Sequence, residues 1–166
     1  MPQFIFTDKA PKPGCYSQAV SEKIGDSIVV FLSGQTGNVP GVEGEPVIEG
    51  GVGPQTTQAL KNIVAVVEEA GGNVHHIIEL KVFLKDSNAG MQSIRQQERG
   101  GARKAFGEAY ERFFADRGRW KGHGNFPART MHWVPEVPLE YPEEDTLVEI
   151  TAVAVIPTIL SYRAAL

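Results

Sequence analysis

Residues Asn125–Trp133, with the sequence NFPARTMHW, predict a turn that leads directly into a β-strand. Pro127 fixes its own φ angle and disfavours helix for Phe126 before it. The residues from Thr130 onward are β-branched or bulky, which is typical of strands. Arg129 therefore stands at the strand entrance, where its side chain can reach a cleft while its backbone stays anchored. Its planar, permanently charged guanidinium suits a carboxylate or phosphate, although a surface ion pair would also explain an arginine here.

Length and composition predict one globular domain over residues 1–166, with 42% apolar and 22% charged residues. The formal net charge of -4 argues against a general nucleic-acid binder, which needs clustered positive charge. Apolar runs are shorter than the roughly 20 residues that span a bilayer, and Met1–Lys9 lacks the pattern of a signal peptide. A single cysteine, Cys15, excludes an internal disulfide and fits a reducing compartment. We therefore expect a cytoplasmic protein.

Periodicity and turn residues predict the remaining elements. A short apolar opening at Phe4–Thr7 precedes a loop, and glycine-rich residues 38–53 form a second loop. Alternation along Ile77–Leu84 places Ile78, Leu80, Val82 and Leu84 on one face of a strand. The other predicted elements are a strand at Cys15–Val20, a hairpin turn at Gly25–Asp26, a strand at Ile28–Leu32, a turn at Ser33–Gly37, helices at Pro54–Ala70 and Ala102–Ala115, and a strand at Leu147–Ile156.

This order of elements predicts an α+β sandwich, in which two helices pack on one face of a mixed sheet of five or six strands. Such a sheet has a second face that needs cover. Leu147–Ile156 carries small and apolar residues on both sides, which favours cover by other subunits and hence a homo-oligomer. The pattern leaves open whether Gln92–Arg103 is an additional helical turn or a loop.

Five segments in order resemble the Rid (YjgF) family of reactive-intermediate imine deaminases. The segment GCYSQAV at residues 14–20 is similar to the family's G-P-Y-S-Q-A, and SGQ at 33–35 matches its S-G-Q turn. QALKNI at 58–63 with EAGG at 69–72 matches its first helix, FPAR at 126–129 its P-A-R, and VEI at 148–150 its V-E-I. The resemblance spans nearly the whole chain, and the combination is much more specific than any one segment.

The resemblance implies a chorismate-mutase-like subunit in a homotrimer, with clefts between neighbouring subunits. It also implies hydrolysis of 2-imino or enamine acids to 2-oxo acids and ammonia, without a metal or cofactor. In that reaction Arg129 would bind the substrate carboxylate, and Glu149 would hold or activate the attacking water. Tyr16 and Ser33 would line the cleft, Gly34 would let the ligand approach its backbone, and Met131 would contribute its backbone carbonyl.

Each of these residues also has a purely structural explanation. A carboxylate on an otherwise apolar strand is costly unless it is paired, so Glu149 would otherwise be the partner of a nearby cation. Tyr16 would otherwise be a core or interface aromatic residue, and Ser33 would satisfy backbone groups at a turn. Cys15 has no catalytic partner in a recognisable motif and fits an inert thiol. The histidines at 75, 76, 123 and 132 lack the ligand spacing of a zinc site.

Three residues depart from the family pattern. Cys15 replaces the proline before Tyr16, Gly107 replaces the asparagine of the second helix, and Met131 replaces the cysteine after Arg129. Relative to the family pattern, residues 92–103 and 117–124 look like insertions, and such insertions would reshape the mouth of the cleft. These departures concern the choice of substrate, and they keep open a non-catalytic trimer that binds small carboxylates. The resemblance also implies a second alternative, an endoribonuclease or translation inhibitor, against which the net negative charge and the lack of a histidine pair for acid–base cleavage argue.

Overall fold

A computed structural model describes residues 1–86, 92–118, 125–137 and 145–158, without the side chains of 92–98. Six strands form one sheet in the order β1-β2-β3-β6-β4-β5. The strands are β1 (Gln3–Ile5), β2 (Ala19–Ile24), β3 (Ser27–Thr36), β4 (Ile77–Lys85), β5 (Ala128–Val134) and β6 (Val148–Pro157). The helices are α1 (Val52–Glu69), the short 3-10 turn η1 (Val74–His76) and α2 (Gln92–Ala115).

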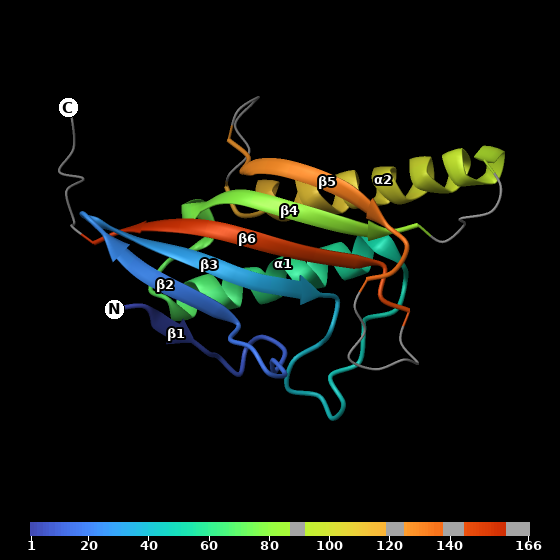
Figure 1. Cartoon of the computed structure of the whole chain (residues 1–166). Helices are drawn as coiled ribbons and strands as arrows, with labels where there is room; N and C mark the ends of the chain where they lie inside the picture. The colour runs from blue at the N-terminus through green and yellow to red at the C-terminus, as the bar shows by residue number, and fades with distance from the viewer. Residues whose placement is uncertain (87–91, 119–124, 138–144, 159–166) are drawn as a thin grey trace.

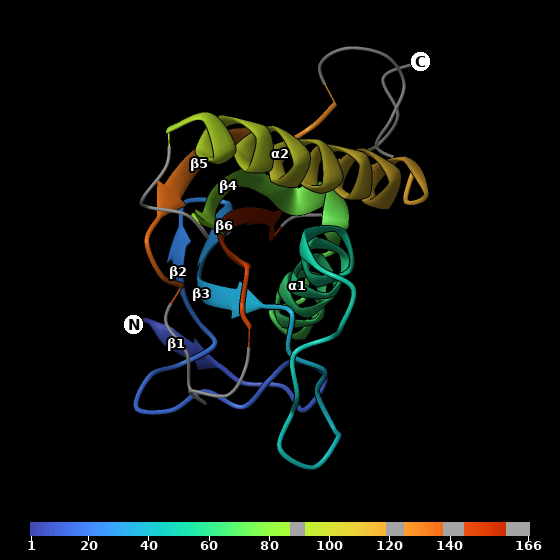
Figure 2. The same ribbon diagram turned by 90° about the vertical axis from the view of Figure 1, so that its right-hand side faces the viewer.

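Both long helices lie on the same side of the sheet, as Figures 1 and 2 show from two directions. The sheet is mixed, because β4 and β5 are parallel while the other neighbours are antiparallel. A parallel pair needs a crossover between its strands, and α2 supplies it. The predicted α+β architecture is therefore confirmed, with six strands. Within the described residues, neither helix is long and apolar enough to cross a membrane.

The core lies between the helices and one face of the central strand β6. Buried and partly buried residues alternate along β6, as expected for a strand with two different faces. Val148, Ile150 and Ala152 point to the helices, where they join buried residues such as Leu60 and Phe114. Glu149 and Thr151 therefore belong to the opposite face, which we call the open face.

The open face carries exposed apolar side chains. Phe31 on β3 and Phe4 on β1 are 55% and 65% exposed, and both strands place them in the row that contains Val20 and Val153. A single chain leaves this row in contact with solvent. Large contiguous apolar patches are characteristic of interaction surfaces, in agreement with the sequence-based expectation of a cover on this face.

Four details differ from the sequence-based prediction or complete it. The strand predicted at Cys15–Val20 is wrong, because pairing begins only at Ala19. The buried Gln18 amide donates to the carbonyls of Thr7, Ala10 and Pro11, so it holds the preceding segment in a loop. The undecided residues 92–103 belong to α2. Of the predicted connections at 117–124 and 135–145, residues 119–124 and 138–144 lie outside the described residues.

Two strand irregularities explain the remaining differences. The sequence predicts a turn at Ser33–Gly37, but β3 continues to Thr36, so the prediction is wrong for residues 33–36. The strand changes its register with β6 between Leu32 and Gln35. A second irregularity between Ile77 and Glu79 turns Ile78 outward, where it is 49% exposed, and Ile77 takes the buried position. A bulge inserts one residue and shifts which side chains face the core.

Candidate functional site

Glu149 and Gly34 are in direct contact on the open face. Glu149 is paired with Thr36 on β3 and Phe83 on β4, so it lies in the middle of three strands. A Cβ atom on Gly34 would lie 1.7 Å from the Glu149 carboxylate oxygen Oε1 and 2.7 Å from Cδ. Only glycine therefore leaves space at this position for the carboxylate in its observed place. The irregular register of β3 between Leu32 and Gln35 includes Gly34.

Burial changes the proton affinity of Glu149. Desolvation disfavours the charged form and raises the pKa of Glu149 above its ordinary value of 4.5. No ion pair of Glu149 is found within the described part of the chain, so the sequence-based alternative of a structural cation partner has no support there. A carboxyl group with a raised pKa exchanges protons more readily near neutral pH than an ordinary glutamate does. This shift makes Glu149 a candidate for a general acid or base.

Ser33 precedes Gly34 on β3, and its hydrogen bonds join it to the segment that carries Tyr16. The Ser33 hydroxyl donates to the Ser17 carbonyl at 2.7 Å, and the Ser33 amide donates to the Gln18 carbonyl at 3.0 Å. These bonds fasten the segment that carries Tyr16, which is 50% exposed, beside the Gly34 end of β3. We call Glu149, Gly34, Ser33 and Tyr16 the Glu149 half-site.

Arg129 lies in a different environment. It is the second residue of the edge strand β5 and is exposed, and its guanidinium carbon is 4.6 Å from the ring centroid of Tyr110 and 5.2 Å from that of Phe106. Both rings belong to α2, and cation–π contacts of this length are attractive. The aromatic rings orient the guanidinium without using its hydrogen-bond donors. The donors remain suited to a carboxylate, which a guanidinium can bind through two parallel hydrogen bonds.

Met131 lies on the same side of β5 as Arg129. Its side chain is half-buried and packs against the core. Gly107, at the position of the family's asparagine, lies on α2 between the two aromatic residues, and a Cβ there would meet nothing within 4 Å. We call Arg129, Phe106, Tyr110 and Met131 the Arg129 half-site. Sequence reasoning placed Phe106 and Tyr110 in the apolar stripe of a helix, and their spacing alone gives no sign of a contact with Arg129.

The two half-sites lie on opposite faces of the sheet. Arg129 is paired with Leu80, which is fully buried toward the helices, whereas Glu149 is paired with Phe83 on the open face. Leu80 and Phe83 are three positions apart on β4, so their side chains point to opposite sides. The structure therefore unites Glu149, Gly34 and Ser33, and it unites Arg129 with α2, but one chain does not place the two charged groups face to face.

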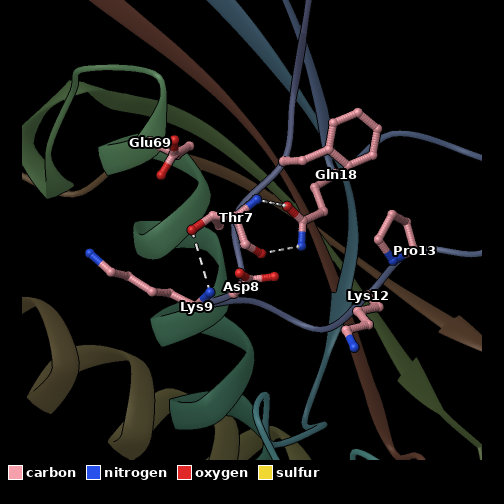
Figure 3. Close-up of a pocket in the computed structure, with 8 residues that line it drawn as sticks. Thr7, Asp8, Lys9, Lys12, Pro13, Gln18 and Glu69 are labelled. Atoms are coloured by element: carbon pink, nitrogen blue, oxygen red, sulfur yellow. Dashed lines mark hydrogen bonds between the residues drawn. The ribbon is translucent and has the colours of Figure 1, made fainter.

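A separate depression of about 490 Å³ lies near the N-terminus, with eight lining residues drawn in Figure 3. Gln18 closes its wall by accepting from the Thr7 amide at 2.6 Å and donating to the Thr7 carbonyl at 3.0 Å. Lys9 and Lys12 share this depression with Asp8 and Glu69, so neither sign of charge dominates. None of its lining residues belongs to either half-site, so it is a separate place. Within the described residues, no group of three or more His, Cys, Asp or Glu side chains is arranged to hold a metal ion.

The fold and these contacts define a class of protein: a small α+β domain with an open-faced sheet, a half-buried glutamate over a glycine, and an arginine at the sheet edge. The family model described as Endoribonuclease L-PSP matches residues 7–156. A RutC family protein of Pyrococcus horikoshii is 34% identical over 155 residues, which cover 93% of this chain and 98% of that protein. The chain therefore belongs to the Endoribonuclease L-PSP family, also called the YjgF, Rid or RutC family.

Two further relatives have informative names. A 2-iminobutanoate/2-iminopropanoate deaminase of Rattus norvegicus is 32% identical over 155 residues, with coverage of 91% of this chain and 88% of that protein. The crystal structure of E. coli TdcF with bound serine has a TM-score of 0.67 and 27% identity, and the match covers 92% of this chain and 98% of TdcF. The first shows that the family includes an imine deaminase, and the second shows that a protein of this fold binds a small molecule.

Proposed function

We propose that this protein hydrolyses 2-imino acids to 2-oxo acids and ammonia. Water adds to the C=N carbon, and one of its protons moves to the nitrogen to give a carbinolamine. The remaining hydroxyl proton then moves to the nitrogen, the C=O bond forms, and the C–N bond breaks to release ammonia. An imine carbon is already electrophilic, so the catalyst mainly has to orient the substrate and the water. This demand is compatible with a site of few residues and without a cofactor.

The observation that carries this proposal is the position of Glu149. Its carboxylate lies over Gly34, where no side chain separates it from a ligand that approaches the β3 backbone. Its raised pKa suits a group that takes a proton from water and later delivers it to the departing nitrogen. The rat relative that bears the name of an imine deaminase supports the same reaction.

Arg129 is proposed to bind the carboxylate of the substrate. The aromatic rings of Phe106 and Tyr110 lie 5.2 and 4.6 Å from its guanidinium carbon and hold the group at the edge of the sheet. The serine bound to TdcF supports a ligand of this kind, because serine carries a carboxylate next to the carbon that bears nitrogen, as a 2-imino acid does. Tyr16, Ser33 and the backbone of Met131 are proposed as further contacts.

We propose that two subunits complete each site. Arg129 and Glu149 lie on opposite faces of the sheet in one chain, so a cleft between subunits would bring the Arg129 half-site of one subunit to the Glu149 half-site of the next. The apolar row on the open face, which includes Phe4 and Phe31, supplies a surface for such an assembly. A homotrimer with three equivalent clefts satisfies both requirements.

The experiment uses an amino-acid oxidase to generate a 2-imino acid and measures the rate at which the imine disappears. The wild type is expected to accelerate the loss, and Arg129→Ala and Glu149→Gln are expected to lower kcat/KM by about a hundredfold or more. Lys104→Ala, which removes an exposed charge on α2, is the matched control and keeps wild-type rates. Equal rates for the wild type and Arg129→Ala would refute the proposal. Binding of a 2-oxo acid without any turnover would instead favour the non-catalytic carboxylate binder.

A further inference from the structure

Three amide side chains are buried on one side of α1. Gln55, Gln58 and Asn62 are 3%, 9% and 0% exposed, and their spacing of three and four residues places them in one row along the helix. We call these residues the amide row. Burying an amide is unfavourable unless its hydrogen bonds are satisfied, so the partners of the amide row show what it does.

Asn62 holds the end of β3. Its Nδ2 donates to the carbonyl of Thr36 at 3.1 Å and to that of Asn38 at 2.9 Å. Gln58 Nε2 in turn donates to Asn62 Oδ1 at 2.9 Å, which fixes the orientation of the asparagine. Thr36 is the residue of β3 that is paired with Glu149. Asn62 therefore fastens the strand position directly beside the candidate catalytic carboxylate.

Gln55 holds the segment that leads into β6. Its Nε2 donates to the Asp145 carbonyl at 2.9 Å, and its Oε1 accepts from the Leu147 amide at 2.8 Å. Leu147 precedes Glu149 by two residues. The chain after β3 also packs closely on this side chain, since a Cβ on Gly37 would lie 2.9 Å from Gln55 Cβ. One helix thus fastens both backbone segments that meet at Glu149.

We infer that the amide row is a positioning element for the Glu149 half-site: it fixes β3 and β6 relative to each other, so that the Glu149 carboxylate stays over Gly34. The inference rests on the proposed function of Glu149 as the acid or base. Little displacement of β3 relative to β6 is tolerated at this contact, because the carboxylate has space only where Gly34 lies beneath it. A displacement of about 1 Å of a catalytic group can reduce the rate about a hundredfold.

A simple structural role for the amide row would be to satisfy backbone groups where the strands end. The two explanations differ in what happens to Glu149 when an amide is lost. Asn62→Leu keeps the approximate shape of the side chain and removes the bond to Thr36 at the end of β3 and the bond to Asn38 just after it. We expect kcat to fall by about tenfold to a hundredfold with KM changed by less than about threefold, since substrate binding by Arg129 does not involve this helix.

The matched control is Thr56→Val on the same helix. Thr56 is fully buried, and its hydroxyl donates to the Val52 carbonyl within α1 at 2.7 Å, so the substitution removes a hydrogen bond inside the helix and leaves the bonds of the amide row in place. Thr56→Val is expected to keep the wild-type kcat even where its Tm falls as far as that of Asn62→Leu. An equal loss of kcat in both variants would overturn the inference. If Asn62→Leu does not fold, Gln58→Met removes only the bond that orients Asn62 and is expected to give a smaller loss of kcat in the same direction.

A titration of the Glu149 side chain by carbon-13 NMR tests the inference even if the protein hydrolyses no imine. The charged or titratable side chains on the open face of β4 and β5 are Glu79, Lys81, Lys85 and His132. Asp145 is paired with Lys85, Tyr16 belongs to the Glu149 half-site, and none of these residues is changed by the substitutions. When the Glu149 carboxylate is no longer held over Gly34, water reaches it. The pKa of Glu149 is therefore expected to fall toward its ordinary value in Asn62→Leu but not in Thr56→Val. An unchanged pKa of Glu149 in Asn62→Leu would overturn the inference, whereas a wild type without turnover would refute only the proposed reaction.

Discussion

Replacement of Gly34 with alanine tests the contact that defines the Glu149 half-site. The new methyl carbon would lie 1.7 Å from Glu149 Oε1 and 2.9 Å from Glu149 Cγ. Non-bonded heavy atoms rest about 3.5 Å apart, so the carboxylate must move by about 2 Å. The φ angle of Gly34 is not among the positive values of the chain, so backbone strain adds nothing to this effect.

The expected cost follows from these distances. Overpacking of a tightly filled site costs about 1–3 kcal/mol, and the lower entropy of unfolded alanine returns about 0.4–1 kcal/mol. We therefore expect the free energy of unfolding to fall by about 1–2 kcal/mol. A shift of the carboxylate by this distance is expected to lower kcat by about a hundredfold or more.

The assay combines denaturant unfolding with imine hydrolysis in a double-mutant cycle. In a Glu149→Ala background the methyl group has no carboxylate to displace, so Gly34→Ala is expected to be neutral or slightly stabilising. Gly101→Ala on α2 is the control, because a Cβ there meets nothing within 4 Å. Equal costs of Gly34→Ala in the two backgrounds would refute the placement of Glu149 over Gly34.

Three further predictions follow from the same geometry. Arg129→Lys keeps the positive charge but loses the planar guanidinium, so KM for the imino acid is expected to rise by about tenfold with little change in Tm. An unchanged KM in steady-state assays would contradict the role of Arg129. Because the pKa of Glu149 is raised, the folded state loses stability as pH rises from 4.5 through that raised value. Glu149→Gln is therefore expected to raise Tm at pH 7 and to lose this advantage below pH 4.5. Calorimetry that finds no gain in Tm at pH 7 would exclude a desolvated carboxylate. Phe31→Glu places a charge on the apolar row of the open face and is expected to yield monomers in analytical ultracentrifugation, while an unchanged oligomer would place the interface elsewhere.

The order of elements and the core could be predicted from the sequence because their signals are local. The stripe of Ala59, Ile63, Val66 and Val67 predicts α1, and the alternation of β6 predicts its two faces. Ile78 shows the limit of this reasoning. One inserted residue at the start of β4 exchanges the positions of Ile77 and Ile78, and only pairing with β6 reveals the insertion.

The arrangement of the site could be predicted only in part. The family motifs identify Arg129, Gly34 and Glu149, but β5 is an edge strand with polar residues on both sides, so its pattern does not tell which face Arg129 occupies. That face depends on the register with Leu80. The amide row was missed because polar residues on an amphipathic helix are normally assigned to solvent. Its spacing was visible in the sequence, whereas its partners at Thr36 and Leu147 depend on the tertiary structure.

The most direct measurement of the central claim is the rate of 2-imino acid hydrolysis by mixed oligomers of Arg129→Ala and Glu149→Gln subunits, co-expressed with different tags and purified through both. If each site takes Arg129 from one subunit and Glu149 from its neighbour, every trimer that carries both tags contains one intact site out of three. The account therefore predicts acceleration by the wild type, almost none by either variant alone, and recovery of about a third of the wild-type rate in the doubly tagged mixture. A mixture as inactive as the separate variants would contradict a site shared between subunits, and a wild type without acceleration would contradict the proposed reaction itself.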